Sequence, residues 1–248
     1  MPFKKAKGPL YARQLLCAMY NGESYFMMVD AHSTFCDHWD TLLKQEYRHL
    51  KYHCGVPRPI ISAYSALTEQ QQKDGVVHHL CSASPVTNGK LYPGRTESVP
   101  IVKSATYKLT AYLSCHYTFA SGALCEVFAR ALAFKGFLFK HVFWGEEALL
   151  ACVAYTHGYD VYTPPAVHLL HAYAQNHPPT PSWRSAVAAP SRSKQQREDS
   201  EQAMQCLLDP FATIAQPQLR SVRDFWVAAG FVFDNGTPLP VQSNALCT

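Results

Sequence analysis

The sequence predicts an α/β fold in which a mixed central sheet is flanked by helices. Short apolar runs alternate along the chain with amphipathic segments of helical period, which is the pattern of a layered α/β domain. The chain has 248 residues, enough to bury a sizeable core. Hydrophobic residues make up 48% of it and charged residues 16%, which excludes a disordered chain and a coiled coil.

The chain opens with a predicted helix, a strand and a second helix. Residues 9–20 place leucines on one face and Pro9 in the first turn, which favours a helix. Residues 25–29, YFMMV, form a short apolar run typical of a strand buried on both faces. Asp37 can cap the next helix, over 38–50, in which apolar residues keep helical spacing.

A strand over 58–67 precedes a polar stretch. Residues 68–99 are rich in Gly, Pro, Gln and Ser, and we expect a long excursion with at most one short hairpin. Residues 107–119 have strand character. The remaining predicted elements are helices over 123–133, 147–158, 200–208 and 220–231 and a strand over 160–162.

These elements suggest three regions. Residues 1–175 would form the catalytic core. Residues 176–200, rich in Pro, Ser and Arg, would form a flexible linker or loop. Residues 201–248 would form a helical segment packed on the core.

The amino-acid composition limits the binding partners and the cellular compartment that we expect for this protein. The net charge is +4 and the basic residues form no stripe, so we expect no nucleic-acid partner. No uncharged apolar stretch reaches about 18 residues, so we expect no membrane association through a span. The nine cysteines are widely spaced, and most lie among apolar residues, which is typical of free, buried thiols in a reducing compartment. We therefore expect a cytoplasmic protein.

A predicted strand that runs directly into Asp30-Ala31-His32 is the most informative motif. Just past a strand end, both polar side chains can turn toward one ion, and a carboxylate with an imidazole suits Mn²⁺ or another divalent cation. The alternative is a turn-capping aspartate beside a surface histidine, because so short a motif is common by chance.

Two further segments carry polar groups suited to a binding site. In FWGEE, Gly145 would let the backbone approach a ligand, and Glu146 and Glu147 could reach sugar or acceptor hydroxyls. The alternative is that the paired acids stabilise a helix start. In PPAVHLLHAY, His168 and His171 follow a strand, where a histidine is either a ligand or a packed core residue.

Together and in this order, the motifs resemble those of the cytosolic polypeptide N-acetylglucosaminyltransferase family. The matching segments are Gly8–Arg13 (G-P-x-x-A-R), Tyr20–Tyr25 (Y-x-G-E-x-Y), Asp30–Asp40 (D-S-H-x-x-F, then W-D), Arg58–Tyr64 (ending S-x-Y), Phe143–Glu147 (F-x-G-E-E), Thr156–Tyr162 (T-x-G-Y-D-x-Y) and Leu219–Arg223. A more distant similarity, to polypeptide GalNAc-transferases, shares the D-x-H, the W-G-x-E and a late histidine.

The resemblance implies a GT-A-type glycosyltransferase that uses UDP-GlcNAc and a divalent metal ion. It puts Asp30, His32 and His171 on the metal, with His168 the less favoured third ligand. Around the donor and acceptor it puts Arg13, Asp30, Trp144, Gly145, Glu146 and Glu147, the last two as catalytic residues.

The resemblance also implies partners and a mechanism. The partners are a sugar nucleotide and a protein acceptor, of which a hydroxyproline-bearing ubiquitin-ligase adaptor is the family's example. A divalent ion would neutralise the negative charge that develops on the diphosphate leaving group. Members of the family are described as retaining.

The chain departs from the family's pattern in two places. Phe134–Phe137 lacks the acidic and proline residues that the family carries before F-x-G-E-E. The G-P-x-x-A-R segment begins at Gly8, whereas in the family a strand–helix–strand portion that forms much of the uridine pocket precedes it. We therefore expect an N-terminally incomplete domain whose uncovered sheet edge permits self-association.

Two other functions stay open at this point. One is a non-catalytic or truncated glycosyltransferase remnant that keeps the metal-binding corner without turnover. The other is an unrelated metal-dependent hydrolase, which no H-E-x-x-H or comparable motif supports.

Overall fold

The structure, a computed structural model, describes residues 6–65, 71, 74, 76–83, 96–102, 106–133, 138–142, 145–166, 168–171, 191–209, 211–214, 218–234 and 237–240. At its centre is a five-stranded sheet in the order β1-β7-β3-β8-β6. These strands are β1 (Tyr25–Val29), β7 (Tyr117–Ser121), β3 (Pro59–Ser62), β8 (Asp160–Thr163) and β6 (Lys108–Thr110). The β3–β8 pair is parallel and the other three pairs are antiparallel. The predicted mixed α/β sheet with flanking helices is confirmed.

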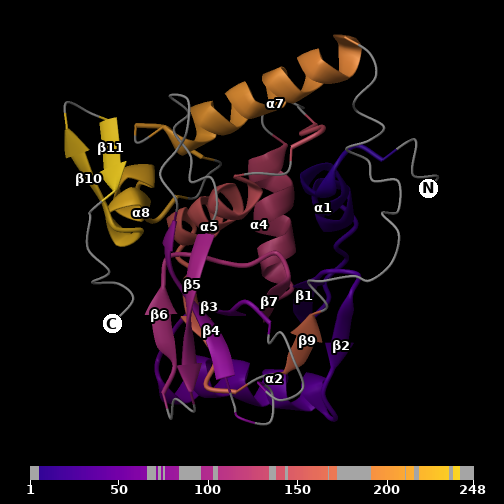
Figure 1. Ribbon diagram of the computed structural model, residues 1–248, viewed down its shortest axis with the longest axis vertical. Helices are drawn as coiled ribbons and strands as arrows, with labels where there is room; N and C mark the ends of the chain where they lie inside the picture. Colours follow the sequence, from indigo (N-terminus) through magenta and orange to yellow (C-terminus); the bar gives the residue numbers. More distant parts are fainter. Residues whose placement is uncertain are drawn as a thin grey trace.

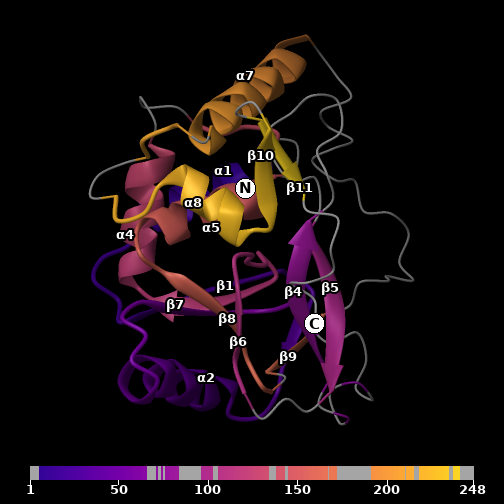
Figure 2. The same ribbon diagram turned by 90° about the vertical axis from the view of Figure 1, so that its left-hand side faces the viewer.

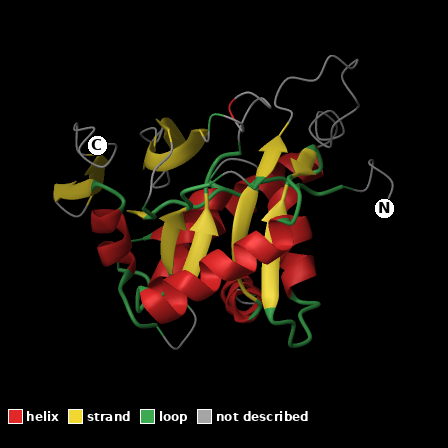
Figure 3. Ribbon diagram, turned by 90° about the horizontal axis from the view of Figure 1, so that it is seen from below, coloured by secondary structure: helices red, strands yellow, loops and turns green. Residues whose placement is uncertain are grey.

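Helices cover both faces of this sheet (Figures 2 and 3). On one face lie α1 (Pro9–Cys17), α4 (Ala123–Leu132), α5 (Glu146–Thr156) and α8 (Val222–Ala228). On the other lies α2 (Trp39–Arg48). In Figures 1 and 2, α2 and the helix α7 (Ser191–Leu208) lie at opposite ends of the molecule, with the sheet between them.

Side chains along β3 and β7 alternate between two hydrophobic cores. Ile60 is paired with Ala120, and both face the larger core under α1, α4, α5 and α8. Ile61 is paired with Phe119, and both face the smaller core against α2. All four residues of β3 are buried, which explains why this strand reads as a continuous apolar run rather than an alternating one.

The first strand differs from its prediction in position within the sheet. β1 has the predicted bounds but lies at the sheet edge, paired only with β7 among the described strands. Only Met28 of its five residues is buried. A strand at the edge of a sheet can be as apolar as a central strand, so the apolar sequence of β1 does not show where in the sheet it lies.

Two other predicted strand regions are organised differently. The region predicted as one strand over 107–119 divides into β6 and β7, because the chain bends at Ser114–Tyr117. Within the predicted excursion over 68–99, the chain forms β4 (Val76–Ala83), which pairs antiparallel with β5 (Thr96–Val102). This hairpin is longer than predicted. Residues 68–99 are rich in glycine and proline, and this composition outweighs the short apolar segments that form the two strands.

Helix α2 begins one residue later than predicted. Its N-cap is His38, with φ of 59°, and no side chain accepts a capping hydrogen bond. The predicted cap at Asp37 is therefore wrong. Past Arg48 the helix continues as a π-helical turn, His49–His53, a local widening that often accompanies functional regions.

The C-terminal region contains more regular structure than predicted. Helix α7 spans Ser191–Leu208, so residues 191–200 of the predicted flexible segment are helical. Its first half has no apolar face and is supported by spaced polar pairs such as Lys194 with Glu198, which explains why composition suggested disorder. The segment predicted as helical also holds the hairpin of β10 (Phe231–Asp234) and β11 (Thr237–Pro240). Residues 172–190 lie outside the described residues.

The cysteines are only partly the free, buried thiols that were predicted. Four of the described free cysteines are buried, namely Cys17, Cys115, Cys125 and Cys152. Cys36 is half-buried, and Cys54 and Cys206 are exposed. Cys81 is disulfide-bonded, so the prediction was wrong for this residue.

Replacing Gly122 by alanine should destabilise the chain strongly. Gly122 caps α4 and donates its N–H to the carbonyl oxygen of Ser24, 3.0 Å away. An added Cβ would lie 1.8 Å from the carbonyl oxygen of Glu23, so backbone would have to move. We expect a loss of about 3 kcal/mol in unfolding free energy, measured by urea denaturation.

Gly55→Ala is the control for this variant. Gly55 has φ of +71°, and nothing lies within 4 Å of an added Cβ. The left-handed backbone alone should cost about 1 kcal/mol. Equal losses in the two variants would show that the contact with Glu23 is not the cause.

Candidate active site

Polar side chains from six segments meet at one end of the strands of the central sheet. Asp30 follows the end of β1, and Tyr64 lies two residues beyond the end of β3. His116 immediately precedes β7, which runs antiparallel to both. The ends of β1 and β3 and the start of β7 therefore lie at the same end of the sheet. The other three segments are the short strand β9 (Leu169–His171), the middle of α1, which carries Arg13, and the start of α5, which carries Glu146.

Asp30 lies beside two imidazoles. Its Oδ2 is 3.4 Å from Nε2 of His116 and 3.6 Å from Nε2 of His171. The two rings stack with centroids 5.2 Å apart and planes 10° apart. Burial lowers the pKa of His116 and of His171. Both rings are therefore neutral near pH 7, the form in which an imidazole nitrogen can bind a metal ion.

His32 lies at the outer side of this group. Its ring centroid is 6.1 Å from that of His171, and its side chain is exposed. His32 precedes β2 (Ser33–Phe35), whose Ser33 pairs with His171 across the β2–β9 ladder. The ladder thus brings the D-x-H segment and the late histidine together from positions about 140 residues apart in the sequence.

Arg13 links Asp30 to the start of α5. Its Nη1 donates to Oε2 of Glu146 at 2.7 Å, and its Nη2 lies 3.7 Å from Oδ1 of Asp30. The arginine and Glu146 side chains are 13% and 7% exposed. A guanidinium keeps its charge at any physiological pH, so Arg13 is a fixed positive charge between two carboxylates.

The two glutamates at the start of α5 are held by different partners. Gly145, with φ of 86°, begins the helix. Glu147 accepts a hydrogen bond from the backbone N–H of Cys115 at 2.8 Å and one from the hydroxyl of Tyr64 at 3.4 Å. Burial raises the pKa of Glu146 to about 7, against the opposing charge of Arg13, and burial also raises the pKa of Glu147. The site therefore holds three carboxyl groups beside one guanidinium.

Buried hydroxyls fix the bend that carries Cys115 and His116 into the site. Ser62 Oγ donates to the carbonyl of Tyr117 at 2.7 Å and accepts from the N–H of Ser114 at 2.8 Å. Ser114 Oγ in turn accepts from the N–H of His116 at 3.1 Å. Ser62 and Ser114 are fully buried. Bending β7 away from its neighbour would leave these polar groups unpaired, so the bend is specified by the core.

The sequence-predicted site residues are distributed unevenly over this arrangement. Asp30, His171, Arg13 and Glu146 lie together, Glu147 faces the adjoining bend, and Gly145 supplies the helix start. His32 lies at the periphery, and Trp144 lies outside the described residues, as do residues 134–137. His168 is buried beside the smaller core, where it contacts Glu46 and Tyr117.

His116 and Cys115 were not predicted from the sequence. The sequence alone gives little reason to select a histidine that directly precedes a buried strand. His116 reaches Asp30 because its strand, β7, runs antiparallel to β1. Tyr64 had a stronger signal, because it ends the S-x-Y segment that resembles the family. The pairing of β7 with both β1 and β3 is what brings these residues to Asp30.

No group of three or more His, Cys, Asp or Glu side chains within the described ranges is already arranged to hold a metal ion. The chemistry of the donor set nevertheless fits a divalent cation, since one carboxylate adjoins two neutral imidazoles. Ligand atoms bound to one ion at about 2.0–2.3 Å lie roughly 3–3.7 Å apart, which matches the separations from Asp30.

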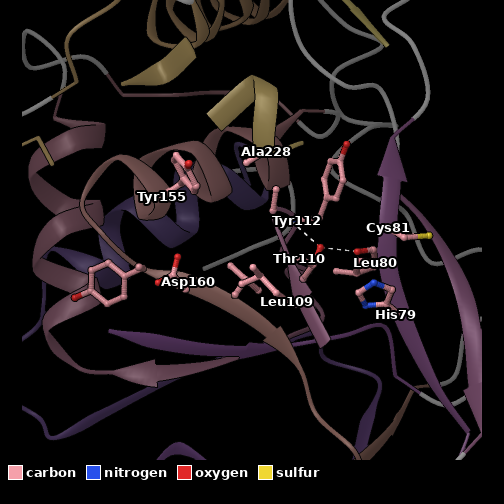
Figure 4. Close-up of a pocket in the computed structure, with 12 residues that line it drawn as sticks. His79, Leu80, Cys81, Leu109, Thr110, Tyr112, Tyr155, Asp160 and Ala228 are labelled. Carbon is pink, nitrogen blue, oxygen red and sulfur yellow. Dashed lines mark hydrogen bonds between the residues drawn. The ribbon is translucent and has the colours of Figure 1, made fainter. Parts of the chain in front are cut away.

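A hollow of about 140 Å³ lies at the other end of the strands from Asp30 (Figure 4). Asp160, at the start of β8, and Thr110, in β6, line it together with Tyr155. Asp160 forms an ion pair with Arg220 at 2.7 Å, and Thr110 donates its hydroxyl to the carbonyl of Leu80. Because β8 runs parallel to β3 and β1, this hollow and Asp30 lie at opposite ends of the strands.

Comparison with known proteins identifies one matching family. A family model described as "Glycosyltransferase (GlcNAc)" matches residues 1–221. No curated protein sequence and no solved structure matches the chain significantly. In the part of the chain that the structure describes, no helix combines the length and hydropathy needed to cross a membrane.

The carboxyl group of Glu146 should lower the unfolding free energy as the pH rises from about 4.3 to about 7. Its pKa is about 7 in the folded chain and about 4.3 in an unfolded one. Between these values the native state holds a proton that the unfolded state has released, so stability falls with rising pH. The stabilising contribution of the protonated Glu146 is fully present below the unfolded pKa. As the pH rises to the folded pKa of about 7, up to roughly 3 kcal/mol of it is lost.

Glu146→Gln should remove this part of the pH dependence. Urea denaturation at several pH values, compared between the wild type and the variant, isolates it from other titrating groups. Glu126→Gln is the matched control, because the Glu126 side chain is 56% exposed in a surface pair with Arg130. A wild-type slope that persists in Glu146→Gln would contradict the assignment.

Proposed function

The chain belongs to the GlcNAc glycosyltransferase family, and on that premise we propose that it transfers N-acetylglucosamine from UDP-GlcNAc to a protein hydroxyl with the help of a divalent ion such as Mn²⁺. One observation carries the proposal. Asp30, His116 and His171 gather at one end of the sheet, within reach of the Arg13–Glu146 pair.

The charges of the site support a bound cation. Asp30, Glu146 and Glu147 supply three carboxyl groups, whereas Arg13 supplies the one guanidinium paired with them. The pKa of each glutamate is raised because burial disfavours its charged form. A divalent ion held by Asp30, His116 and His171 would balance this negative charge.

A bound divalent ion would neutralise the negative charge that develops on the leaving diphosphate. The residues of this chain would do the rest. Asp30 and the two imidazoles would hold the ion, and Arg13 would fix the carboxylate of Asp30 in orientation. Glu146, with a pKa of about 7, can hold or release a proton near neutral pH. We assign it to the hydroxyl groups of the sugar or the acceptor, with Glu147 beside it.

The acceptor proposal is drawn from resemblance alone. The segments that resemble the hydroxyproline-modifying enzymes include Asp30–Asp40 and Thr156–Tyr162. They support a protein hydroxyl as acceptor, with hydroxyproline as the first to test. A cytoplasmic location would fit such an acceptor, and it too stays a proposal.

Asp30→Asn should abolish ligand-induced stabilisation by UDP with Mn²⁺. A ligand that binds only the native state raises its stability by an amount set by the ratio of ligand concentration to Kd. The wild type should melt several degrees higher with UDP and Mn²⁺ together than with either alone. UDP-GlcNAc hydrolysis should fall at least about tenfold in the variant, in proportion to the weaker metal binding.

Asp37→Asn provides the matched control, because Asp37 is exposed and lies seven residues along the chain from Asp30. The Asp37→Asn variant should be stabilised by UDP with Mn²⁺, and should hydrolyse UDP-GlcNAc, to the same extent as the wild type. If Asp30→Asn is stabilised equally, the metal assignment is wrong. If the wild type binds UDP with Mn²⁺ but shows neither hydrolysis nor transfer, the remnant alternative is favoured.

A further inference from the structure

Two buried side chains, Tyr117 and His168, and the half-buried Glu46 form a hydrogen-bonded series next to the histidines of the site. The hydroxyl of Tyr117 lies 2.5 Å from Nδ1 of His168, and Nε2 of His168 lies 3.1 Å from Oε1 of Glu46. Tyr117 and His168 are each 1% exposed, and the Glu46 side chain is 15% exposed. The series joins β7, the residue before β9, and α2.

The direction of each hydrogen bond follows from the groups present. A phenol is protonated near neutral pH, and a carboxylate can only accept. Nε2 of His168 therefore donates its hydrogen to Glu46. In a ring that carries this one N–H, Nδ1 is left as the acceptor for the hydroxyl of Tyr117. Glu46 also lines an open hollow of about 390 Å³ with His49 and Tyr107, and its Oε2 is buried without a hydrogen-bond partner among the described residues. Every member thus has a defined role as donor or acceptor.

This series spans a junction that backbone pairing leaves open. β9 pairs with β2 in a two-stranded ladder, whereas β7 belongs to the five-stranded sheet. No ladder joins β9 to β7 in the described strands. Their positions relative to one another are set by side chains: Leu169 packs in the smaller core with Tyr117 and Phe119, and His168 makes the directional contact with Tyr117.

The junction matters because each side of it carries one histidine of the site. His116 immediately precedes Tyr117, and His171 follows His168 by three residues. The two rings stack with centroids 5.2 Å apart and share Oδ2 of Asp30. A shift of β9 against β7 would change the distance between these two imidazoles.

We propose that His168, held between Glu46 and Tyr117, is a positioning residue that fixes the separation of His116 and His171. The sequence made His168 a candidate metal ligand; in the structure it supports the ligands. The relevance of this role to sugar transfer rests on the proposed function, but the positioning itself does not.

Tyr117→Phe tests the proposal, with Tyr112→Phe as its matched control. Each variant removes one buried phenol hydroxyl, because Tyr112 is 2% exposed and donates to the carbonyl of Ala229. Tyr112 lines the hollow at the other end of the strands from Asp30. Both variants should therefore lose thermal stability to a similar extent. Only Tyr117→Phe should raise the Kd for UDP with Mn²⁺, by about tenfold, measured by calorimetry.

A measurement without metal or nucleotide separates this proposal from the proposed function. Imidazole ¹H–¹⁵N spectra should show shifted or broadened signals of His116 and His171 in Tyr117→Phe and unchanged signals in Tyr112→Phe. Unchanged histidine signals in both variants would overturn the positioning role. If the wild type fails to bind UDP with Mn²⁺, the proposed function fails, and the spectra still decide whether His168 positions the two histidines.

Discussion

The burial of two carboxylates at the start of α5 is the constraint on which the arrangement of the site depends. Glu146 and Glu147 are adjacent, so their side chains leave the helix in different directions and need separate partners. Arg13 meets one from α1, and the N–H of Cys115 with the hydroxyl of Tyr64 meets the other from the end of the sheet. Leaving either carboxylate unpaired in this interior would cost several kcal/mol, so α5, the end of the sheet and α1 are fixed relative to one another.

The same pairing orients the residues that adjoin Asp30. Arg13 reaches Asp30 only because Glu146 holds its guanidinium, and His116 lies beside Asp30 only because the bend at Ser114–Tyr117 is anchored twice. One anchor is Glu147 on the N–H of Cys115, and the other is the buried hydroxyl of Ser62. The chemistry of the site is thus organised by neighbours that have no direct contact with Asp30.

Much of the fold was predictable because the local pattern of apolar residues matched the residues that are buried in the structure. The bounds of β1, and those of α4 and α5 to within two residues, were predicted from apolar patterning alone. The site was predictable where a motif sits at the end of such an element, as with Asp30 and Glu146. His116 was not, since its importance depends on strand order, a property that local sequence does not encode. The second half of α7 lies within the helix predicted over 200–208, whereas its first half was not predicted, because that half is polar and its spaced charges pair along the helix surface.

The two halves of the site are held by different kinds of interaction. Arg13, Glu146 and Glu147 are joined by charged contacts and rest on the larger core through α1 and α5. His171 lies on β9, whose ladder with β2 is separate from the main sheet and only three residues long. Short ladders with few backbone hydrogen bonds open at lower free energy than core strands do. His171 therefore has more freedom to adjust than His116, whose bend is anchored to the main sheet. A contact that orients the strand of His171, such as that between His168 and Tyr117, governs its separation from His116.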